Sequence, residues 1–372
     1  MTKTVIIGGG IVGASTGYLL AKKGMDTVII DRADDGQATD AAAGIICPWL
    51  SQRRNKAWYH LAKNGARYYP ELIAELTADG ETDTGYARVG AISLHTDQKK
   101  LEAMRDRAIK RRENAPEIGD ISLLSQTETK KQFPLLSDEY ASVHVSGAAR
   151  VNGRKLKNAL LRGAEKHGAT LIKGHAEIVV DEDQILGVSV RDQFIKAKTI
   201  VAANGAWMKD LLEPLGIPFD IRPQRAQLMH LHMPGIDPAN WPVVRPPMNQ
   251  YMLPLEDGRI VIGATYEDDV DFDLRITAGG IHEILTKALH IAPELEKASI
   301  LETRVGFRPV VPGSLPIVGR HPHFERLFIA NGLGATGLTM GPFIGKQLAA
   351  LATGESLDID LNRYAVQNAI PK

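Results

Sequence analysis

The chain has 372 residues and equal numbers of basic and acidic side chains, 44 of each, so no net charge attracts nucleic acid or an anionic membrane. Its single cysteine, Cys47, excludes an internal disulfide framework and a multi-cysteine metal site, and favours a reducing, cytoplasmic location. No apolar run reaches the roughly 18 residues that a membrane span needs, so we expect a soluble protein.

The first elements in the chain form a strand, a glycine turn and a second strand. Val5–Ile7 and Val28–Ile30 are short apolar runs, typical of parallel strands buried on both faces. Gly8, Gly10 and Gly13 between them have the G-x-G-x-x-G spacing. The first glycine permits a tight turn, the second lets a pyrophosphate approach the backbone, and the third lets helix and strand pack closely. This pattern predicts a dinucleotide-binding unit.

The helix that begins near Ile11 directs its free N–H groups towards such a pyrophosphate. Asp31 follows the second strand, where a carboxylate accepts hydrogen bonds from a ribose 2′-OH. Small residues from Gly36 to Gly44 then allow the backbone to lie against something large and flat. A flexible surface loop is the alternative interpretation of that last stretch.

Helical periodicity continues over residues 55–78, and Pro70 is expected to break that helix. Residues 86–95 predict a short strand, and residues 99–112 a highly charged helix. Acidic residues are interspersed with the basic ones in this helix and no aromatic residues interleave, which favours a solvated face over a nucleic-acid surface.

The pattern Ser125-Gln-Thr-Glu128 predicts a capping box and a short helix. The glycine turn after residue 203 resembles the opening one and indicates a return to the nucleotide-binding sheet. We expect further helices at about 155–167, 278–291 and 341–352, and strands at 170–173, 176–180, 185–190, 198–203, 221–232, 249–255, 259–265 and 327–330.

Metal and hydrolase chemistry find little support. His230 and His232 share one strand face without an obvious acidic neighbour, and neither H-E-x-x-H nor G-x-S-x-G occurs. Cys47 has no basic residue near it in the sequence, so we expect a buried apolar residue instead of a reactive thiolate.

The remaining candidates for chemistry lie at four places. They are Gly205 in an Ala-Ala-Asn-Gly-Ala turn, Tyr251 before a strand, Arg308 in Gly-Phe-Arg-Pro, and the glycine-rich run 330–342. The last run precedes a helix, so its backbone amides can point at an anionic or carbonyl acceptor.

In this order the motifs resemble the flavoprotein family of D-amino acid oxidase, glycine oxidase and sarcosine oxidase. The resemblance covers nearly the whole chain. It rests on Gly8–Gly13, Asp31, Ala41–Gly44, Val201–Trp207, Tyr251 to Pro254, Ile262–Thr265, Gly306–Pro309, Leu315–Gly319 and the last glycine turn.

The resemblance implies an α/β fold in which a Rossmann-like FAD-binding domain is interleaved with an α+β substrate domain built on a mixed or antiparallel sheet. The FAD-binding domain would comprise residues 1–85, 150–215 and 305–372. The substrate-binding domain would comprise residues 86–149 and 216–304.

The implied cofactor is FAD. The cysteine that tethers flavin in some relatives is absent near the C-terminus, so we expect FAD to be noncovalent. The implied FAD-binding residues are Gly8, Gly10, Ile11, Val12, Gly13, Asp31, Arg32, Ala42, Ala43, Gly44, Ile45, Ile46, Ala203, Gly205, Trp207, Arg308, Gly334, Ala335, Thr336, Gly337, Leu338 and Thr339.

Arg308 matches the family arginine that binds the substrate carboxylate. The planar fork of an arginine side chain suits two-point binding of a carboxylate. A structural salt bridge between domains is the alternative for this residue. Tyr251 matches a substrate-pocket tyrosine, and the alternative is a buried tyrosine that hydrogen-bonds only to backbone.

The implied reaction oxidises the CH–NH bond of a small amino acid of the D-amino acid, glycine, sarcosine or proline type. Hydride transfer to flavin N5 would give an imino or keto acid, with oxygen or a dye- or quinone-like compound as final acceptor. An NAD-dependent dehydrogenase and a non-catalytic FAD-binding or tRNA-modification-related protein are the alternatives. The sequence leaves open the particular amine, oxidase or dehydrogenase, the oligomeric state and the role of Cys47.

Overall fold

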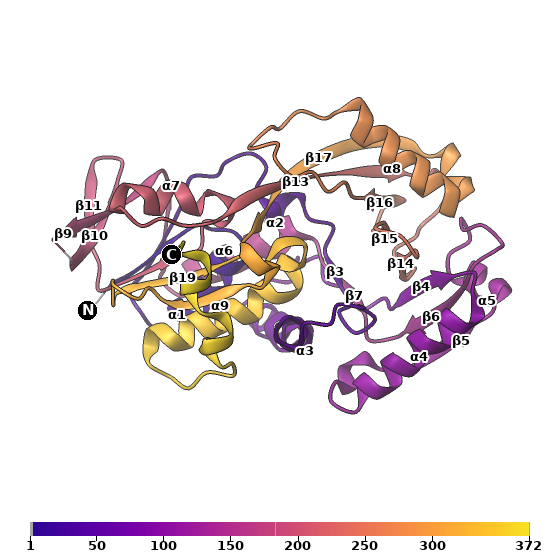
Figure 1. Cartoon of the computed structure of the whole chain (residues 1–372), viewed down its shortest axis with the longest axis horizontal. Helices are drawn as coiled ribbons and strands as arrows, with labels where there is room; N and C mark the ends of the chain where they lie inside the picture. The colour runs from indigo at the N-terminus through magenta and orange to yellow at the C-terminus, as the bar shows by residue number, and fades with distance from the viewer. Residues whose placement is uncertain (1–2, 183, 372) are drawn as a thin grey trace.

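The structure, a computed structural model, describes residues 3–182 and 184–371 (Figure 1). One chain builds two large sheets, a six-stranded sheet that is mostly parallel and an eight-stranded sheet that is mostly antiparallel. The chain enters each sheet more than once, so the two halves of the molecule are interleaved in sequence.

The six-stranded sheet contains the strand–turn–strand unit from the start of the chain. Val5 and Ile7 point to one core and Ile6 to another, because successive side chains alternate across a strand. The strand order is β18 (Ile317–Arg320), β19 (Leu327–Asn331), β12 (Thr199–Ala202), β1 (Thr4–Ile7), β2 (Thr27–Asp31) and β8 (Thr170–Lys173).

Helices cover the Ile6 face of this sheet, and a small sheet with one helix covers the other. The first group is α1 (Ile11–Lys22), α3 (Lys56–Ala78), α6 (Gly153–Lys166) and α9 (Gly337–Thr353). The second is β9 (Ala176–Asp181), β10 (Gln184–Val190), β11 (Gln193–Lys196) and α7 (Met208–Leu212). Both faces of β1 and β2 are therefore buried, as their continuous apolar runs predicted.

The eight-stranded sheet is antiparallel except where β14 pairs with β4. Two long strands, β13 and β17, form its edge nearest the six-stranded sheet (Figure 1). The order is β17 (Ser299–Val310), β13 (Arg222–His232), β16 (Arg259–Gly263), β15 (Tyr251–Pro254), β14 (Val243–Arg245), β4 (Ala91–His95), β6 (Ala141–Val145) and β5 (Ile121–Leu124).

Three helices belong to the part of the molecule around this second sheet: α4 (Gln98–Arg112), α5 (Gln126–Gln132) and α8 (Ala278–Ile291). In Figure 1, β9–β11 lie at one end of the molecule and α4 and α5 at the other. Short elements connect the parts: α2 (Ala38–Ala41), β3 (Ile45–Ile46) and β7 (Ala149–Arg150). No helix in the described ranges is long and apolar enough to cross a membrane.

The expected fold class is confirmed, and several elements agree closely with the sequence. β12 pairs in parallel with β1, so the chain does return to the nucleotide-binding sheet after its excursion. Ser125 and Glu128 form the expected capping box at the start of α5. The division into domains stays a proposal, and its expected boundary at 305 falls inside the continuous strand β17.

Other expectations were wrong. Pro70 does not break α3, because Tyr69 and Leu72 are fully buried beside it and this packing holds the helix despite the missing N–H. The strand predicted over 86–95 is regular only at Ala91–His95. The segment 249–255 is not a neighbour of β13, since β15 pairs with β16, which lies between them.

Candidate functional site

A deep cleft opens where β1, β2 and β12 of the six-stranded sheet end, and β13, β15 and β17 of the other sheet form its far wall. It encloses about 1750 Å³ of space, counted to its open mouth. The carboxyl ends of parallel strands are the usual place for ligands in α/β sheets. The cleft is therefore the candidate site of this protein.

The glycine turn after β1 forms the floor of the cleft. Gly8 has φ +103°, a conformation that disfavours other residues. A Cβ on Gly13 would lie 1.8 Å from the carbonyl oxygen of Gly8, so this glycine lets α1 pack directly against the turn. Gly10 caps α1 without a side chain, and Thr39 Oγ1 accepts a hydrogen bond of 2.9 Å from Ile11 N. The N-terminus of α1 therefore faces the cleft.

Asp31 lies at the end of β2 and lines the cleft. Its carboxylate accepts hydrogen bonds from Gly9 N, from Ala33 N at 2.5 Å and from Gln37 Nε2 at 2.8 Å. A carboxylate has about four lone-pair positions, so it can still accept a bond from a ribose hydroxyl. Asp31 thus fastens the glycine turn and presents a negative charge to the cleft.

Arg308 reaches the cleft from β17 without a counter-ion. No carboxylate in the described ranges lies within ion-pair distance of it, which rules out the inter-domain salt bridge among these residues. Its Nη1 atom makes only two long hydrogen bonds of 3.3 Å, to Gln224 Oε1 and the Thr265 carbonyl. The ring of Tyr266 lies over the guanidinium at 4.2 Å. The cleft therefore contains a positive charge that an anion would neutralise.

Tyr251 lies near this cation at the start of β15 and also lines the cleft. Burial raises the pKa of Tyr251, and the nearby Arg308 charge opposes that shift in part. Its hydroxyl has no hydrogen-bond partner within the described residues, so the expected alternative of a backbone-satisfied tyrosine is not what the structure shows. A protonated hydroxyl that can donate a hydrogen bond thus accompanies the guanidinium.

Most of the other residues named from the sequence also line this cleft. They are Gly8, Gly10, Ile11, Val12, Asp31, Arg32, Ala42, Ala43, Gly44, Ile45, Ala203, Gly205, Trp207, Gly334, Ala335, Gly337, Leu338 and Thr339.

Three predicted contact residues do not line the cleft. Gly13 lies beneath the turn, as its packing against Gly8 requires. Ile46 points into the core and is 1% exposed. The Thr336 hydroxyl turns back to donate a 2.9 Å hydrogen bond to the Leu333 carbonyl.

Sequence reasoning missed several cleft residues that carry polar or aromatic groups. Gln37 and Thr39 lie in the small-residue stretch 36–44, and Asn204 lies in the Ala-Ala-Asn-Gly-Ala turn, so these patterns pointed to them. His175 comes from the loop between β8 and β9, which has no recognisable pattern. Tyr266 directly follows the Ile262–Thr265 motif, which is the only feature that could have pointed to it. These residues are brought together by the pairing of distant segments.

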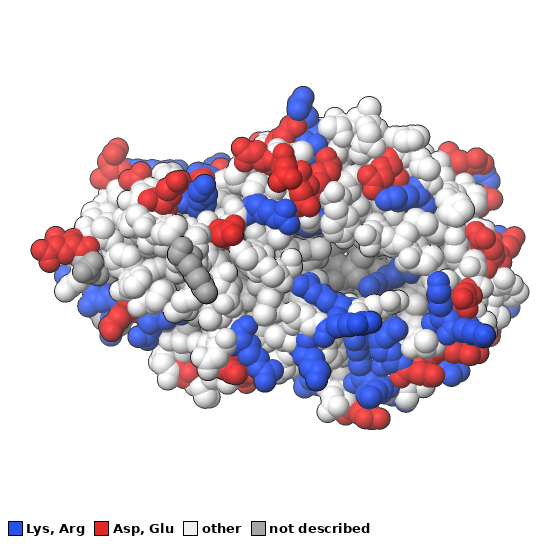
Figure 2. Space-filling view, in the orientation of Figure 1, with Lys and Arg blue, Asp and Glu red and all other residues white. Residues whose placement is uncertain are grey.

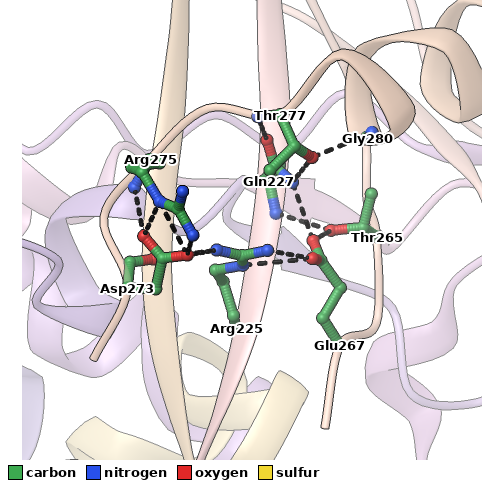
Figure 3. Close-up of polar contacts among 8 residues, drawn as sticks. All are labelled: Arg225, Gln227, Thr265, Glu267, Asp273, Arg275, Thr277 and Gly280. Atoms are coloured by element: carbon green, nitrogen blue, oxygen red, sulfur yellow. Dashed lines mark hydrogen bonds and ion pairs between the residues drawn. The ribbon is translucent and has the colours of Figure 1, made fainter. Parts of the chain in front are cut away.

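A buried polar network holds the segment that carries Tyr266 in place (Figure 3). Arg225, on β13, is 4% exposed and binds Glu267 at 2.5 Å and Asp273 at 2.7 Å. Burial alone would raise the pKa of Glu267, but hydrogen bonds from Gln227, Thr265 and Arg225 hold that pKa below its ordinary value. The carboxylate stays ionised, so the network anchors one wall of the cleft.

Cys47 is buried, as expected, but the expectation that it lacks a basic neighbour was wrong. Arg245 Nη1 lies 3.0 Å from the Cys47 carbonyl oxygen and 3.8 Å from its Sγ. Burial raises the pKa of the thiol, and Arg245 opposes that shift. The basic residue is 198 positions away in the chain, so no local pattern could have indicated it.

The histidine pair on β13 also has an acidic neighbour that the sequence did not reveal. His230 Nδ1 lies 3.7 Å from Glu302, which in turn binds Arg304 at 2.6 Å. Within the described part of the chain no group of three His, Cys, Asp or Glu side chains could hold a metal ion. This cluster is an ion-pair network on the eight-stranded sheet.

Fold and cleft together define a dinucleotide-binding α/β protein whose ligand cleft also exposes an unneutralised arginine. Residues 3–351 match the family model described as "DAO: FAD dependent oxidoreductase". The chain belongs to this family of FAD-dependent oxidoreductases.

Individual relatives agree with this assignment. The chain is 56% identical to the oxidoreductase YurR of Bacillus subtilis (strain 168), over the full length of both. It is 44% identical to the structure of iminodiacetate oxidase from Chelativorans sp. BNC1, with a TM-score of 0.94 and coverage of 97% and 98% of the two chains. It is 26% identical to the structure of glycine oxidase from Geobacillus kaustophilus, with a TM-score of 0.85 over both whole chains.

The residues of the cleft fit FAD, the cofactor of this family. α1 and α9 both begin at the cleft, and neither N-cap residue makes a side-chain cap. Thr39 binds Ile11 N of α1, and the other N–H groups of the two first turns suit a pyrophosphate and a polar ring edge. Asn204 Oδ1 is buried at the cleft without a hydrogen-bond partner in the described chain. A bound donor group would satisfy it. The family assignment also replaces the nicotinamide alternative with FAD.

Proposed function

We propose that this protein oxidises the C–N bond of a small amine that carries a carboxylate, such as glycine, sarcosine, proline, a D-amino acid or an imino diacid. FAD would be held noncovalently and would accept the hydride. The product would be an imine, which water converts to a keto acid or aldehyde and a free amine. The family assignment supports the oxidoreductase class, and the cleft supports the substrate class.

The observation that most supports this proposal is the position of the Arg308 guanidinium. It lies in the cleft with no carboxylate partner, and two hydrogen bonds of 3.3 Å are its only polar contacts within the described chain. A substrate carboxylate would bind its fork at two points, each charged hydrogen bond being worth about 1.5–3 kcal/mol. Tyr251 would donate a further hydrogen bond to the same carboxylate.

Positioning would be the main contribution of these side chains. With the carboxylate fixed at Arg308, the Cα–H is held in one orientation, which lowers the entropic cost of the reaction. The apolar walls at Ala42, Ala43 and Leu338 would exclude water and favour the neutral amine. No side chain needs to act as a strong base in this scheme.

The substrate is identified most directly by anaerobic bleaching of the purified yellow protein. The panel contains glycine, sarcosine, proline, D-amino acids and iminodiacetate, the last because a structural relative is named as its oxidase. Bleaching by at least one amine carboxylate, and by none of the corresponding amines without a carboxylate, is the expected result. Bleaching by simple amines alone would contradict the proposal.

The final electron acceptor is tested next, and oxygen and a quinone-like compound are the two candidates. A peroxide assay in air, run beside a dye-reduction assay with the same substrate, separates oxidase from dehydrogenase. A cytoplasmic location is part of the proposal and is supported by the single, buried cysteine.

A further inference from the structure

A second recess, which shares no lining residue with the cleft, lies where the segment before α3 meets α4. It encloses about 890 Å³ of space, counted to its open mouth. Figure 2 shows Lys and Arg side chains gathered on this face of the molecule, over α3 and α4. The residues that matter are Arg53, Arg54, Lys56, Tyr59, Arg107 and Arg111.

These cations have no negative partners. No acidic side chain lines the recess, and none of its cations forms an ion pair with a described residue. Basic residues close by are neutralised: Arg67 binds Glu117 at 3.2 Å and Arg105 binds Asp106 at 2.8 Å. Since the whole chain has no net charge, the unpaired cluster is a local feature and not a consequence of a basic composition.

The guanidinium groups are held in place by stacking and by backbone contacts. Arg111 lies over the Tyr59 ring at 4.5 Å and donates a 2.8 Å hydrogen bond to the Ser51 carbonyl. Arg53 lies over the Trp58 ring at 5.0 Å. Stacking on a ring face leaves the edge of a guanidinium free to bind oxygen atoms.

Two donors at this recess have no acceptor in the described chain. Arg107 Nη1 and the Tyr59 hydroxyl are buried without a hydrogen-bond partner in the described chain. Burial lowers the pKa of Arg53 and Arg111, and the neighbouring Arg107 charge lowers that of Arg111 further. A bound anion would supply acceptors and relieve the repulsion between these charges.

We propose that this recess binds a small oxyanion with two or more negative charges. A single charge would leave most of the cluster unneutralised, whereas a compact polyvalent anion can bridge guanidinium groups from both segments. Phosphate compounds and polycarboxylates share this chemistry. The site is separate from the proposed amine oxidation, so either can fail without the other.

Calorimetric titration of the flavin-loaded protein tests the site. Pyrophosphate and citrate are titrated separately at constant ionic strength, set with sodium chloride. At least one of the two anions should bind saturably with one site per chain. Tighter binding of pyrophosphate would indicate a phosphate compound as the ligand, and tighter binding of citrate would indicate a polycarboxylate. The double variant Arg54→Gln/Arg107→Gln should weaken that binding at least tenfold. Arg105→Gln, on the same helix but already paired, should leave it unchanged.

Two results would overturn the proposal. One is the absence of saturable heat for both anions in the wild-type protein. The other is equal affinity in the double variant, which would show that the anion binds outside this recess. Arg54 is exposed, so Arg54→Gln alone keeps the test decisive if a thermal melt shows that the double variant is misfolded.

Discussion

Replacing Arg308 by alanine removes the guanidinium that we propose binds the substrate carboxylate. The side chain makes two hydrogen bonds of 3.3 Å to neutral groups and stacks under Tyr266 at 4.2 Å. These contacts are weak, and the stacking contributes about 0.5–1 kcal/mol at an exposed site. We therefore expect Arg308→Ala to fold, to remain yellow and to lose little stability.

The effect on catalysis should be much larger. Two charged hydrogen bonds of about 1.5–3 kcal/mol each give a loss of about 3–6 kcal/mol in transition-state binding. At about 1.4 kcal/mol per factor of ten, kcat/KM for an amine carboxylate should fall by about 10²- to 10⁴-fold. Arg308→Lys keeps the charge but not the planar fork, so its loss should be intermediate.

Steady-state rates and anaerobic flavin bleaching measure this effect with the best substrate of the panel. Arg320→Ala is a matched control, since Arg320 also lies over an aromatic ring, that of Phe328 at 5.5 Å, but lines no part of the cleft. An unchanged kcat/KM in Arg308→Ala would refute the carboxylate role. Loss of the flavin instead would show that this arginine holds the cofactor.

Four further variants test other parts of the structure. Tyr251→Phe removes the hydrogen bond that we propose to the substrate carboxylate and should lower kcat/KM by about 10- to 100-fold without changing the flavin spectrum. Gly13→Ala places a Cβ 1.8 Å from a carbonyl oxygen, so the purified protein should have a lower ratio of flavin to protein absorbance. Burial lowers the pKa of His230 from 6.5 to about 3, so wild-type stability falls as the pH drops below 6.5, because only the unfolded chain takes up the proton. Between pH 7.5 and pH 5.0, the free energy of unfolding should fall by about 2 kcal/mol less in His230→Gln than in the wild-type protein. Chemical denaturation measures both values, and an equal fall in the two proteins would contradict this. Glu267→Gln removes one of the two carboxylates that bind the buried Arg225 guanidinium and leaves Asp273 in place, so it should cost about 1.5–3 kcal/mol in urea unfolding.

Local sequence patterns were enough to predict the first strand, the glycine turn, the helix and the second strand with its terminal Asp31. These features are contiguous, and a few residues of local periodicity and turn geometry decide them. The capping box at Ser125 and the helix at 278–291 were predictable for the same reason. The order of motifs along the chain was also enough to indicate the family, which the match over residues 3–351 confirms.

Which distant residues meet depends on the folded arrangement of the strands and could not be predicted from local patterns. Arg308, Tyr251 and Tyr266 come from separate strands and loops, and strand pairing brings them to one wall of the cleft. Arg245 reaches Cys47 across 198 positions.

The helix across Pro70 survives because its buried neighbours outweigh a local preference. The basic recess likewise joins the segment before α3 to one face of the basic helix α4, and the sequence does not reveal which of these cations lack an acidic partner in space. Local patterns fix elements because they depend on neighbours in the chain, whereas charge neutralisation and burial depend on neighbours in space.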